Sequence, residues 1–157
     1  MMAADEGAAI LETNNDGPKI PDVKKTKFDV IIIGAGPAGY TAGIYCSRAG
    51  YDTLILSGIL PGGQLVNTTE VENYPGFENG IMGPDLMIDM RKQSQKMGTT
   101  IIDDVAVDVD FRRAPYKVLT GSEEYEGLAV IIATGANPRK MGISGEEEFS
   151  GKGVSYC

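Results

Sequence analysis

The sequence contains no histidine among its 157 residues. This absence excludes a histidine general base, a histidine-ligated metal and a Ser-His or Cys-His nucleophile pair. A metal ion would then have to be bound by carboxylates. The closest group of acids, however, alternates along a strand pattern instead of forming an oxygen-ligand loop. We therefore predict no metal site. The acids concerned are Asp103, Asp104, Asp108 and Asp110.

Positive charge and long apolar runs are also scarce. The chain has 14 Lys and Arg against 22 Asp and Glu, a net charge of −8 that repels nucleic acid and anionic membranes. No apolar run approaches the roughly 18 residues needed to span a bilayer, and no basic segment followed by an apolar one opens the chain. We expect a cytoplasmic protein that binds neither membrane nor nucleic acid. In that compartment, no disulfide is expected between its two cysteines, Cys46 and Cys157.

Residues 1–27 are polar and carry few large apolar side chains. We expect them to form a disordered N-terminal extension, with a partner-binding arm as the alternative. The acids and the lack of arginine in this stretch argue against a transit peptide. Residues 28–157 are long enough for one domain with its own core.

The strongest pattern is a β-branched run over residues 30–33, followed by Gly34, Gly36 and Gly39 in the spacing G-x-G-x-x-G. A helical pattern begins at Pro37, so the order is strand, tight turn and helix. Gly34 would permit the turn, Gly36 would admit a pyrophosphate to the backbone, and Gly39 would let the helix lie close to the strand. Helix N–H groups would attract the anion. The pattern indicates a dinucleotide site, the alternative being a glycine-rich turn that binds nothing.

The elements on either side of this turn are predicted from their periodicity. The strand is expected to be fully buried, and the helix to end at Gly50. Residues 51–56 form the next strand, at whose end an acid usually binds a ribose hydroxyl. Ser57 stands there instead, and its hydroxyl would bind a ribose more weakly. The apolar face predicted for the helix consists of Ala38, Ala42, Tyr45, Cys46 and Ala49.

A second glycine-rich turn at residues 61–65 suggests another close approach of backbone to ligand. A helix is expected from Gly83 to Gly98, with Leu86, Met87, Met90 and Met97 as its core stripe. Further strands are predicted at residues 100–102, 116–119 and 125–126, the last two in an antiparallel meander. Between the strand at residues 100–102 and the meander, a half-buried strand is expected with Val105, Val107, Val109 and Phe111 on one face. A fully buried parallel strand is expected at residues 128–132.

Several motifs occur together in one order: G-A-G-P-A-G-Y-T-A (residues 34–42), P-G-G-Q-L (61–65), E-V-E-N-Y-P-G-F (70–77), I-I-A-T-G-A (131–136) and G-K-G-V-S-Y-C (151–157). This set resembles the low-molecular-weight thioredoxin reductases from about residue 28 onward. The resemblance implies an α/β, Rossmann-like FAD-binding domain whose parallel sheet carries an antiparallel β-meander, present here incompletely.

The resemblance also implies the residues of the FAD site. Gly34, Gly36, Pro37 and Ala38 would lie along the pyrophosphate, and Ser57 and Gly58 near the adenosine ribose. Gly62, Gly63, Gln64 and Leu65 would follow the flavin side, with Thr68 and Asn73 near the isoalloxazine and ribityl groups. Val105 would contact the adenine through its backbone, and Ala133, Thr134 and Gly135 would close over the cofactor.

In the family that this chain resembles, electrons pass from NADPH to FAD, then to a C-x-x-C cysteine pair and on to thioredoxin. Cys157 matches the first cysteine of the pair. The second cysteine, the NADPH domain and a C-terminal FAD segment would lie beyond it. We therefore expect the chain alone to be inactive and the complete enzyme to be a homodimer.

Two alternatives stay open from the sequence. In the first alternative, the chain would be a non-catalytic module that binds flavin or a partner. In the second, it would be part of a related peroxiredoxin-linked reductase or dithiol oxidase that shares these motifs.

Overall fold

The computed structural model describes residues 25–155. Residues 1–24 of the predicted extension and the predicted redox residue Cys157 lie outside the described residues. Lys27, predicted as the last residue of the extension, already belongs to the first strand. The elements are β1 (Lys27–Ile33), α1 (Pro37–Arg48), β2 (Thr53–Leu56), the 3-10 helix η1 (Gly63–Asn67), β3 (Glu70–Val71), β4 (Ile81–Met82), α2 (Gly83–Lys96), β5 (Thr100–Ile102), β6 (Ala106–Asp110), β7 (Tyr116–Thr120) and β8 (Glu124–Ile132).

One six-stranded sheet organises the fold, with the strand order β5-β2-β1-β8-β7-β6. Strands β5, β2, β1 and β8 run parallel, and β7 and β6 continue the sheet as an antiparallel meander. β8 serves both parts, because Gly127 is in register with Phe28 of β1 and with Tyr116 of β7. The predicted fold class, a Rossmann-like parallel sheet with an antiparallel meander, is confirmed.

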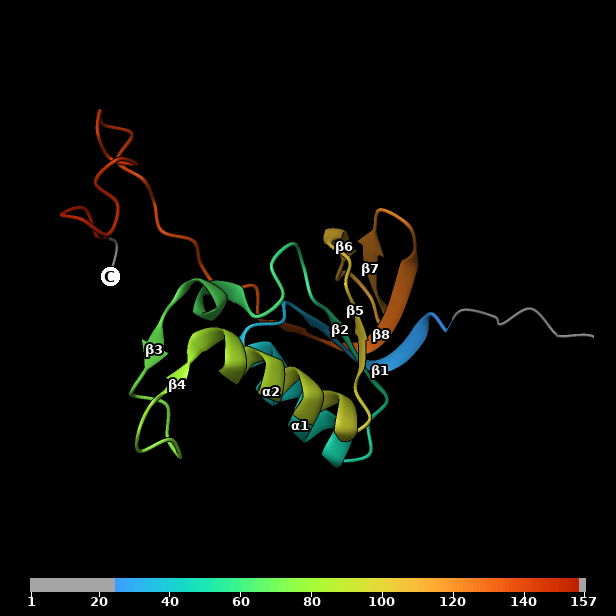
Figure 1. Cartoon of the computed structure of the whole chain (residues 1–157). Coiled ribbons are helices and arrows are strands. Elements are labelled where there is room, and N and C mark those ends of the chain that lie inside the picture. The colour runs from blue at the N-terminus through green and yellow to red at the C-terminus, as the bar shows by residue number, and fades with distance from the viewer. Residues whose placement is uncertain (1–24, 156–157) are drawn as a thin grey trace, which may run out of the picture.

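Helices α1 and α2 lie together on one face of the parallel strands (Figure 1). Ile32 of β1 and Ile55 of β2 point into this layer and are fully buried. They meet Tyr40 of α1, which is 1% exposed, and the α2 side chains Leu86 and Met90. Of the predicted stripe of α2, Leu86, Met87 and Met90 are buried as expected, whereas Met97 is half-buried and follows the end of the helix. Ser94 is buried as well.

The predicted apolar face of α1 is only partly right: Ala42 and Cys46 pack half-buried against the core, whereas Ala38, Tyr45 and Ala49 are exposed. Tyr45 is 69% exposed, and the buried residues of the helix are Gly39, Tyr40 and Gly43. A Cβ at Gly43 would lie 2.7 Å from the Ile55 Cδ1 atom, so this face has no room for larger side chains. The helix therefore packs on the sheet through its glycines, and Cys46 is only half-buried.

The β-meander packs against the opposite face of the parallel strands. Ile31 of β1 and Leu54 of β2 are fully buried against Val118 of β7 and Tyr125 of β8. Within this core, β8 lies close to the Ile31 side chain at Gly127, where a Cβ would lie 2.9 Å from the Ile31 Cγ1 atom. Alternate residues of each central strand thus serve two different cores.

Two burial predictions for the sheet are wrong. Val107 and Val109 of β6 are 64% and 40% exposed, although they were expected on a buried face. β6 is the outermost strand of the sheet, so it has a neighbour on one side only. In β8, Leu128 and Ile132 are 63% and 65% exposed, although the strand is parallel to β1 as predicted. Within residues 25–155, neither the helices nor the meander covers these β8 side chains.

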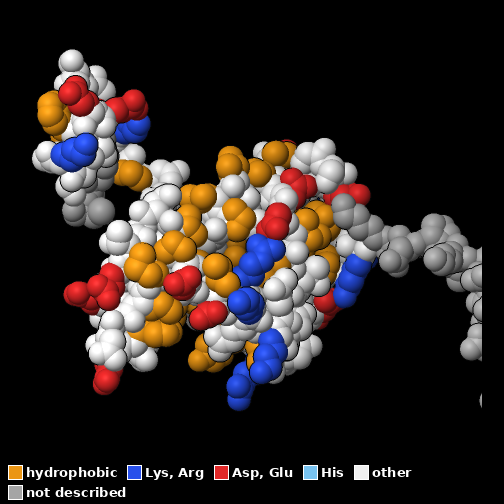
Figure 2. Space-filling view, in the orientation of Figure 1, with side chains coloured by type: hydrophobic (Ala, Val, Ile, Leu, Met, Phe, Trp, Pro, Cys, Tyr) orange, Lys and Arg blue, Asp and Glu red, His pale blue; other side chains and the backbone are white. Residues whose placement is uncertain are grey.

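Charged side chains at the helix ends have the sign that the helix dipole favours. Arg48 lies in the last turn of α1 and Lys96 in the last turn of α2, while Asp85 lies in the first turn of α2. Figure 2 shows Lys and Arg side chains gathered over these helices, whereas acidic side chains mark the end of the molecule near β3 and β4. None of the helices in the described part of the chain is long and apolar enough to cross a membrane.

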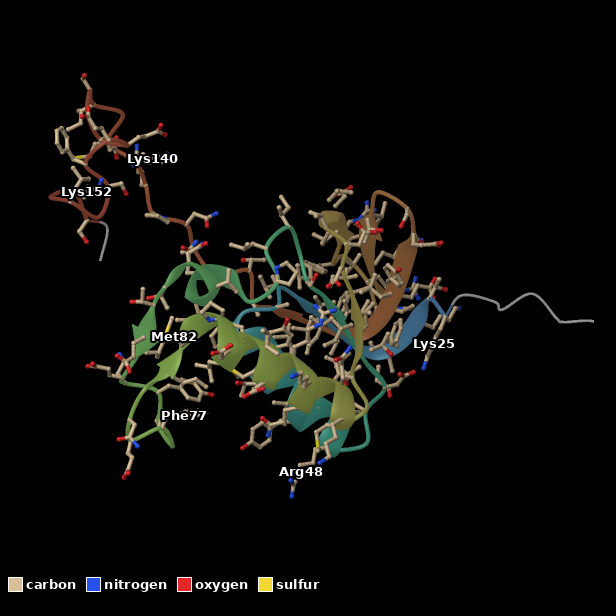
Figure 3. All side chains as sticks on the ribbon, in the orientation of Figure 1. Lys25, Arg48, Phe77, Met82, Lys140 and Lys152 are labelled. Carbon is tan, nitrogen blue, oxygen red and sulfur yellow. The ribbon has the colours of Figure 1, made fainter. Side chains whose placement is uncertain are left out.

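The segment after residue 137 projects away from the sheet, and Lys140 and Lys152 lie on it (Figure 3). Its fold depends on Glu146, which is 3% exposed. The Glu146 carboxylate accepts hydrogen bonds from the backbone N–H groups of Met141 at 2.8 Å and Gly142 at 2.6 Å. One buried carboxylate therefore organises this small loop.

Candidate dinucleotide-binding site

The first glycine loop joins β1 to α1 at the carboxyl end of the parallel strands. Gly34 has φ +109°, a conformation that favours glycine, and its N–H donates to the Leu56 carbonyl at 2.8 Å. A Cβ at Gly34 would lie 2.3 Å from the carbonyl oxygen of Ala133. The ends of β1, β2 and β8 thus converge on this turn, which requires a glycine.

The other two glycines of the loop have different surroundings. A Cβ at Gly39 would lie 2.0 Å from the Gly34 carbonyl oxygen, whereas a Cβ at Gly36 meets nothing within 4 Å in the described structure. The predicted tight turn at Gly34 and close helix packing at Gly39 are therefore confirmed. The open space at Gly36 suits a ligand at the backbone, but its contact with a pyrophosphate stays a prediction.

The N-terminus of α1 faces the same space. Pro37 is its first residue, and among the described residues no side chain caps the helix. The first-turn N–H groups of a helix lack intrahelical acceptors, and together with the helix dipole they attract an anion. This helix N-terminus is thus suited to an anion without a basic side chain from the loop, and anion binding here stays a prediction.

The second glycine loop lies against the first. The N–H of Gly62 donates to the Ala35 carbonyl at 2.8 Å, and a Cβ at Gly63 would lie 3.6 Å from the Cα of Gly36. Gly62 has φ +98° and precedes η1, so the predicted turn continues into a short 3-10 helix. The side-chain amide of Gln64 donates to the Asn137 Oδ1 atom at 2.7 Å.

Ser57 follows β2, next to the first glycine loop, but it is 3% exposed. Its hydroxyl donates to the Asp103 Oδ1 atom at 2.8 Å. Arg91 of α2 donates two further hydrogen bonds to the same carboxylate, at 2.8 and 2.9 Å. These bonds hold the pKa of Asp103 below its usual value, with the Arg91 guanidinium as the main cause. Sequence reasoning missed both Asp103 and Arg91 as residues of this site.

A buried tyrosine completes this group of residues. The Arg91 guanidinium also interacts electrostatically with the hydroxyl of Tyr40 on α1, and burial raises the pKa of that tyrosine. Helices α1 and α2 are thereby linked to the carboxyl ends of β2 and β5. The network of Tyr40, Arg91, Asp103 and Ser57 borders the site on the side of β5.

The other predicted residues are spread more widely. Ala133 donates its N–H to the Ile33 carbonyl at 2.8 Å, so residues 133–135 leave β8 beside the first glycine loop. Thr68 follows η1, and Val105 precedes β6 with its N–H donating to Asp104 Oδ1 at 2.7 Å. Asn73 is exposed on the loop between β3 and β4. The cofactor contacts of these residues stay predictions.

Within residues 25–155, no group of three or more His, Cys, Asp or Glu side chains is placed to hold a metal ion. The described site offers backbone N–H groups, glycine surfaces and one partnered carboxylate.

Comparison with known proteins agrees with this geometry. The profile of the pyridine nucleotide-disulphide oxidoreductase family matches residues 28–157. A thioredoxin reductase of Rickettsia bellii is 52% identical over 134 residues, which are 85% of this chain and 43% of that protein. A thioredoxin reductase of Listeria monocytogenes is 54% identical over 132 residues, 83% of this chain and 40% of that protein.

Solved structures give the same result. The thioredoxin reductase of Streptococcus pyogenes matches with a TM-score of 0.75 and 40% identity, over 84% of this chain and 43% of that one. The chain thus spans about two fifths of the length of the relatives that it matches. From its sequence and its fold, this chain belongs to the pyridine nucleotide-disulphide oxidoreductase family, and within it resembles the thioredoxin reductases.

Proposed function

We propose that residues 28–157 form the first part of the FAD-binding domain of an NADPH-dependent thioredoxin-disulfide reductase. One observation carries the proposal: two glycine loops, joined by the Gly62 to Ala35 hydrogen bond, meet at the N-terminus of α1. Such a surface suits a pyrophosphate, because backbone N–H groups and the helix dipole face it without bulky side chains. The similarity to thioredoxin reductases supports FAD as the dinucleotide.

The roles proposed for the individual residues are those that the resemblance to thioredoxin reductases implies. Gly34, Gly36 and Ala38 would hold the FAD pyrophosphate, and the Gly62–Leu65 loop would support the flavin side. FAD supplies the two-electron carrier that links NADPH to a disulfide. The chain's own contribution is to bind and orient the cofactor at the carboxyl ends of the parallel strands.

Cys157 would supply the first thiol of the redox pair. In thiol–disulfide exchange, a thiolate attacks a thioredoxin sulfur, the thioredoxin disulfide opens, and a second thiol releases the reduced thioredoxin as the pair closes into a disulfide. Two electrons and two protons thereby pass to thioredoxin. We further propose a cytoplasmic homodimer, which the similarity to thioredoxin reductases supports.

FAD binding is tested by titrating the chain with FAD and with FMN, which lacks the adenosine half, while flavin fluorescence is recorded. We expect FAD to bind at least roughly tenfold tighter, because the glycine loops recognise the pyrophosphate. Equal affinity for the two flavins, or no binding of FAD, would contradict the proposal.

The reductase activity is tested with the protein expressed from its complete gene, using NADPH and thioredoxin. Cys157→Ser should abolish thioredoxin reduction. Cys46→Ser, at the half-buried α1 position, is the matched control and should leave the activity unchanged. Loss of activity in both variants, or in neither, would contradict the assigned role of Cys157.

A further inference from the structure

The end of β2 lacks the acid that usually binds the adenosine ribose in a dinucleotide fold. Ser57 stands there, buried and with its hydroxyl donated to Asp103. The space beside the end of β2 nevertheless contains a carboxylate, which comes from the neighbouring strand. We propose that Asp103 supplies the carboxylate that binds the adenosine 2′-hydroxyl, with Ser57 and Arg91 as its positioning residues. This inference rests on the proposed function.

The parallel register brings Asp103 to this place. Leu56 of β2 is paired with Ile102 of β5, so the residues that follow each strand emerge side by side. Two backbone bonds continue the alignment beyond the strands: Ser57 N–H to the Ile102 carbonyl, and Gly58 N–H to the Asp104 carbonyl, both at 3.0 Å. The N–H of Gly34 in turn donates to the Leu56 carbonyl. The glycine loop, Ser57 and Asp103 therefore lie side by side at the carboxyl end of the parallel strands.

The hydrogen bonds of Asp103 leave an acceptor position free for a ligand. An ionised carboxylate has about four acceptor positions. The Oδ1 atom accepts from Ser57 and from Arg91, and Oδ2 accepts once from Arg91. One position on Oδ2 is thus open to a hydroxyl donor. The Asp103 side chain is 57% exposed, so a ligand can reach it.

The surroundings of the carboxylate favour a sugar hydroxyl as its partner. Arg91 is 26% exposed, and its bidentate pairing fixes the plane of the carboxylate. The hydroxyl of Ser57 fixes it from the side of β2. A carboxylate held in this way accepts a hydrogen bond from a 2′-hydroxyl but repels a 2′-phosphate. Asp103 therefore selects an adenosine with a free 2′-hydroxyl, as FAD has.

The test compares ADP with 2′-deoxy-ADP as competitors of FAD for the full 157-residue chain. For the unaltered chain, we expect ADP to bind roughly tenfold tighter, the size of a hydrogen bond to a charged group. Asp103→Asn should lose most of this preference and weaken ADP binding by a similar factor. Asp108→Asn, which removes the same charge from an exposed position on β6, should retain both the affinity and the preference.

The possible outcomes separate this inference from the proposed function. If the unaltered chain binds FAD and ADP but Asp103→Asn keeps the full preference for ADP over 2′-deoxy-ADP, the assignment of Asp103 is wrong and the FAD site stands. If the unaltered chain binds neither FAD nor ADP, the proposed function fails, and this inference fails with it. A circular dichroism melt of each variant identifies any loss of binding that comes from unfolding.

Discussion

The Cα of Gly39 faces the carbonyl oxygen of Gly34 so closely that an added Cβ would lie 2.0 Å from that oxygen. This contact sets the distance between α1 and the end of β1. It cannot be relieved by a side-chain rotation, because the atom in the way belongs to the backbone.

Gly39→Ala should therefore destabilise the fold by about 3 kcal/mol, the upper range for overpacking a tight contact. The measurement is the free energy of unfolding from urea denaturation of the variant and the unaltered chain. An unchanged midpoint would show that α1 can move away from the sheet at little cost.

Gly36→Ala, in the same loop, should have the opposite effects from Gly39→Ala. Its Cβ would enter open space and its φ of −83° suits any residue, so the free energy of unfolding should change by less than about 0.5 kcal/mol. The added methyl group would stand where the proposed pyrophosphate approaches the backbone. FAD affinity should fall by roughly tenfold in a fluorescence titration. A variant that binds FAD normally would place the pyrophosphate elsewhere.

Asp103 should give the fold a dependence on pH. Its pKa is lowered in the folded chain, first by the hydrogen bonds from Arg91, so its ionised form stabilises the fold above the ordinary pKa near ~4. That stabilisation is lost as the pH falls through the lowered folded-state pKa. At neutral pH, Asp103→Asn should lower the free energy of unfolding by at most about 1 kcal/mol, since the pair is partly exposed.

This difference between the variant and the unaltered chain should shrink steadily as the pH falls below about 4. Urea denaturation across this range provides the measurement, with Asp108→Asn as the control for removing one negative charge. A difference that persists unchanged in strong acid would show that Asp103 acts through packing and not through its charge.

Glu146→Gln should loosen the projecting loop locally. The amide keeps only one acceptor oxygen and turns an NH₂ group toward the N–H donors that now meet the carboxylate, namely those of Met141, Gly142 and Ile143. Hydrogen exchange at these three amides should quicken, while exchange in β1 and β2 stays the same. Glu148→Gln, at an exposed position of the same loop, is the control and should leave all of these rates unchanged.

The first glycine loop could be predicted from the sequence because its geometry is local. A strand, three glycines and a helix start within a dozen residues determine the turn, and the structure has the predicted turn at Gly34 and the predicted close packing at Gly39. The face of α1 was predicted only in part, for a physical reason. Large apolar residues usually mark a buried face, but here Gly39 and Gly43 share that face with Tyr40, and Tyr45 is exposed to solvent.

Interactions between strands distant in sequence could not be predicted. The pairing of Ser57 with Asp103 depends on β5 lying beside β2, and the sequence does not reveal this strand order. The exposure of Leu128 has a similar cause: an apolar run predicts a buried strand, but burial depends on which elements lie over it. Local backbone chemistry was thus predictable, whereas the neighbours of each strand end were not.

The hydrogen bond between Gly62 and Ala35 also affects how a ligand binds. Two loops that are already fixed to each other lose little conformational freedom when a ligand arrives, so the entropic cost of association is small. Binding of a dinucleotide should then resemble docking to a rigid surface, with an association rate set by diffusion and orientation and not by loop closure.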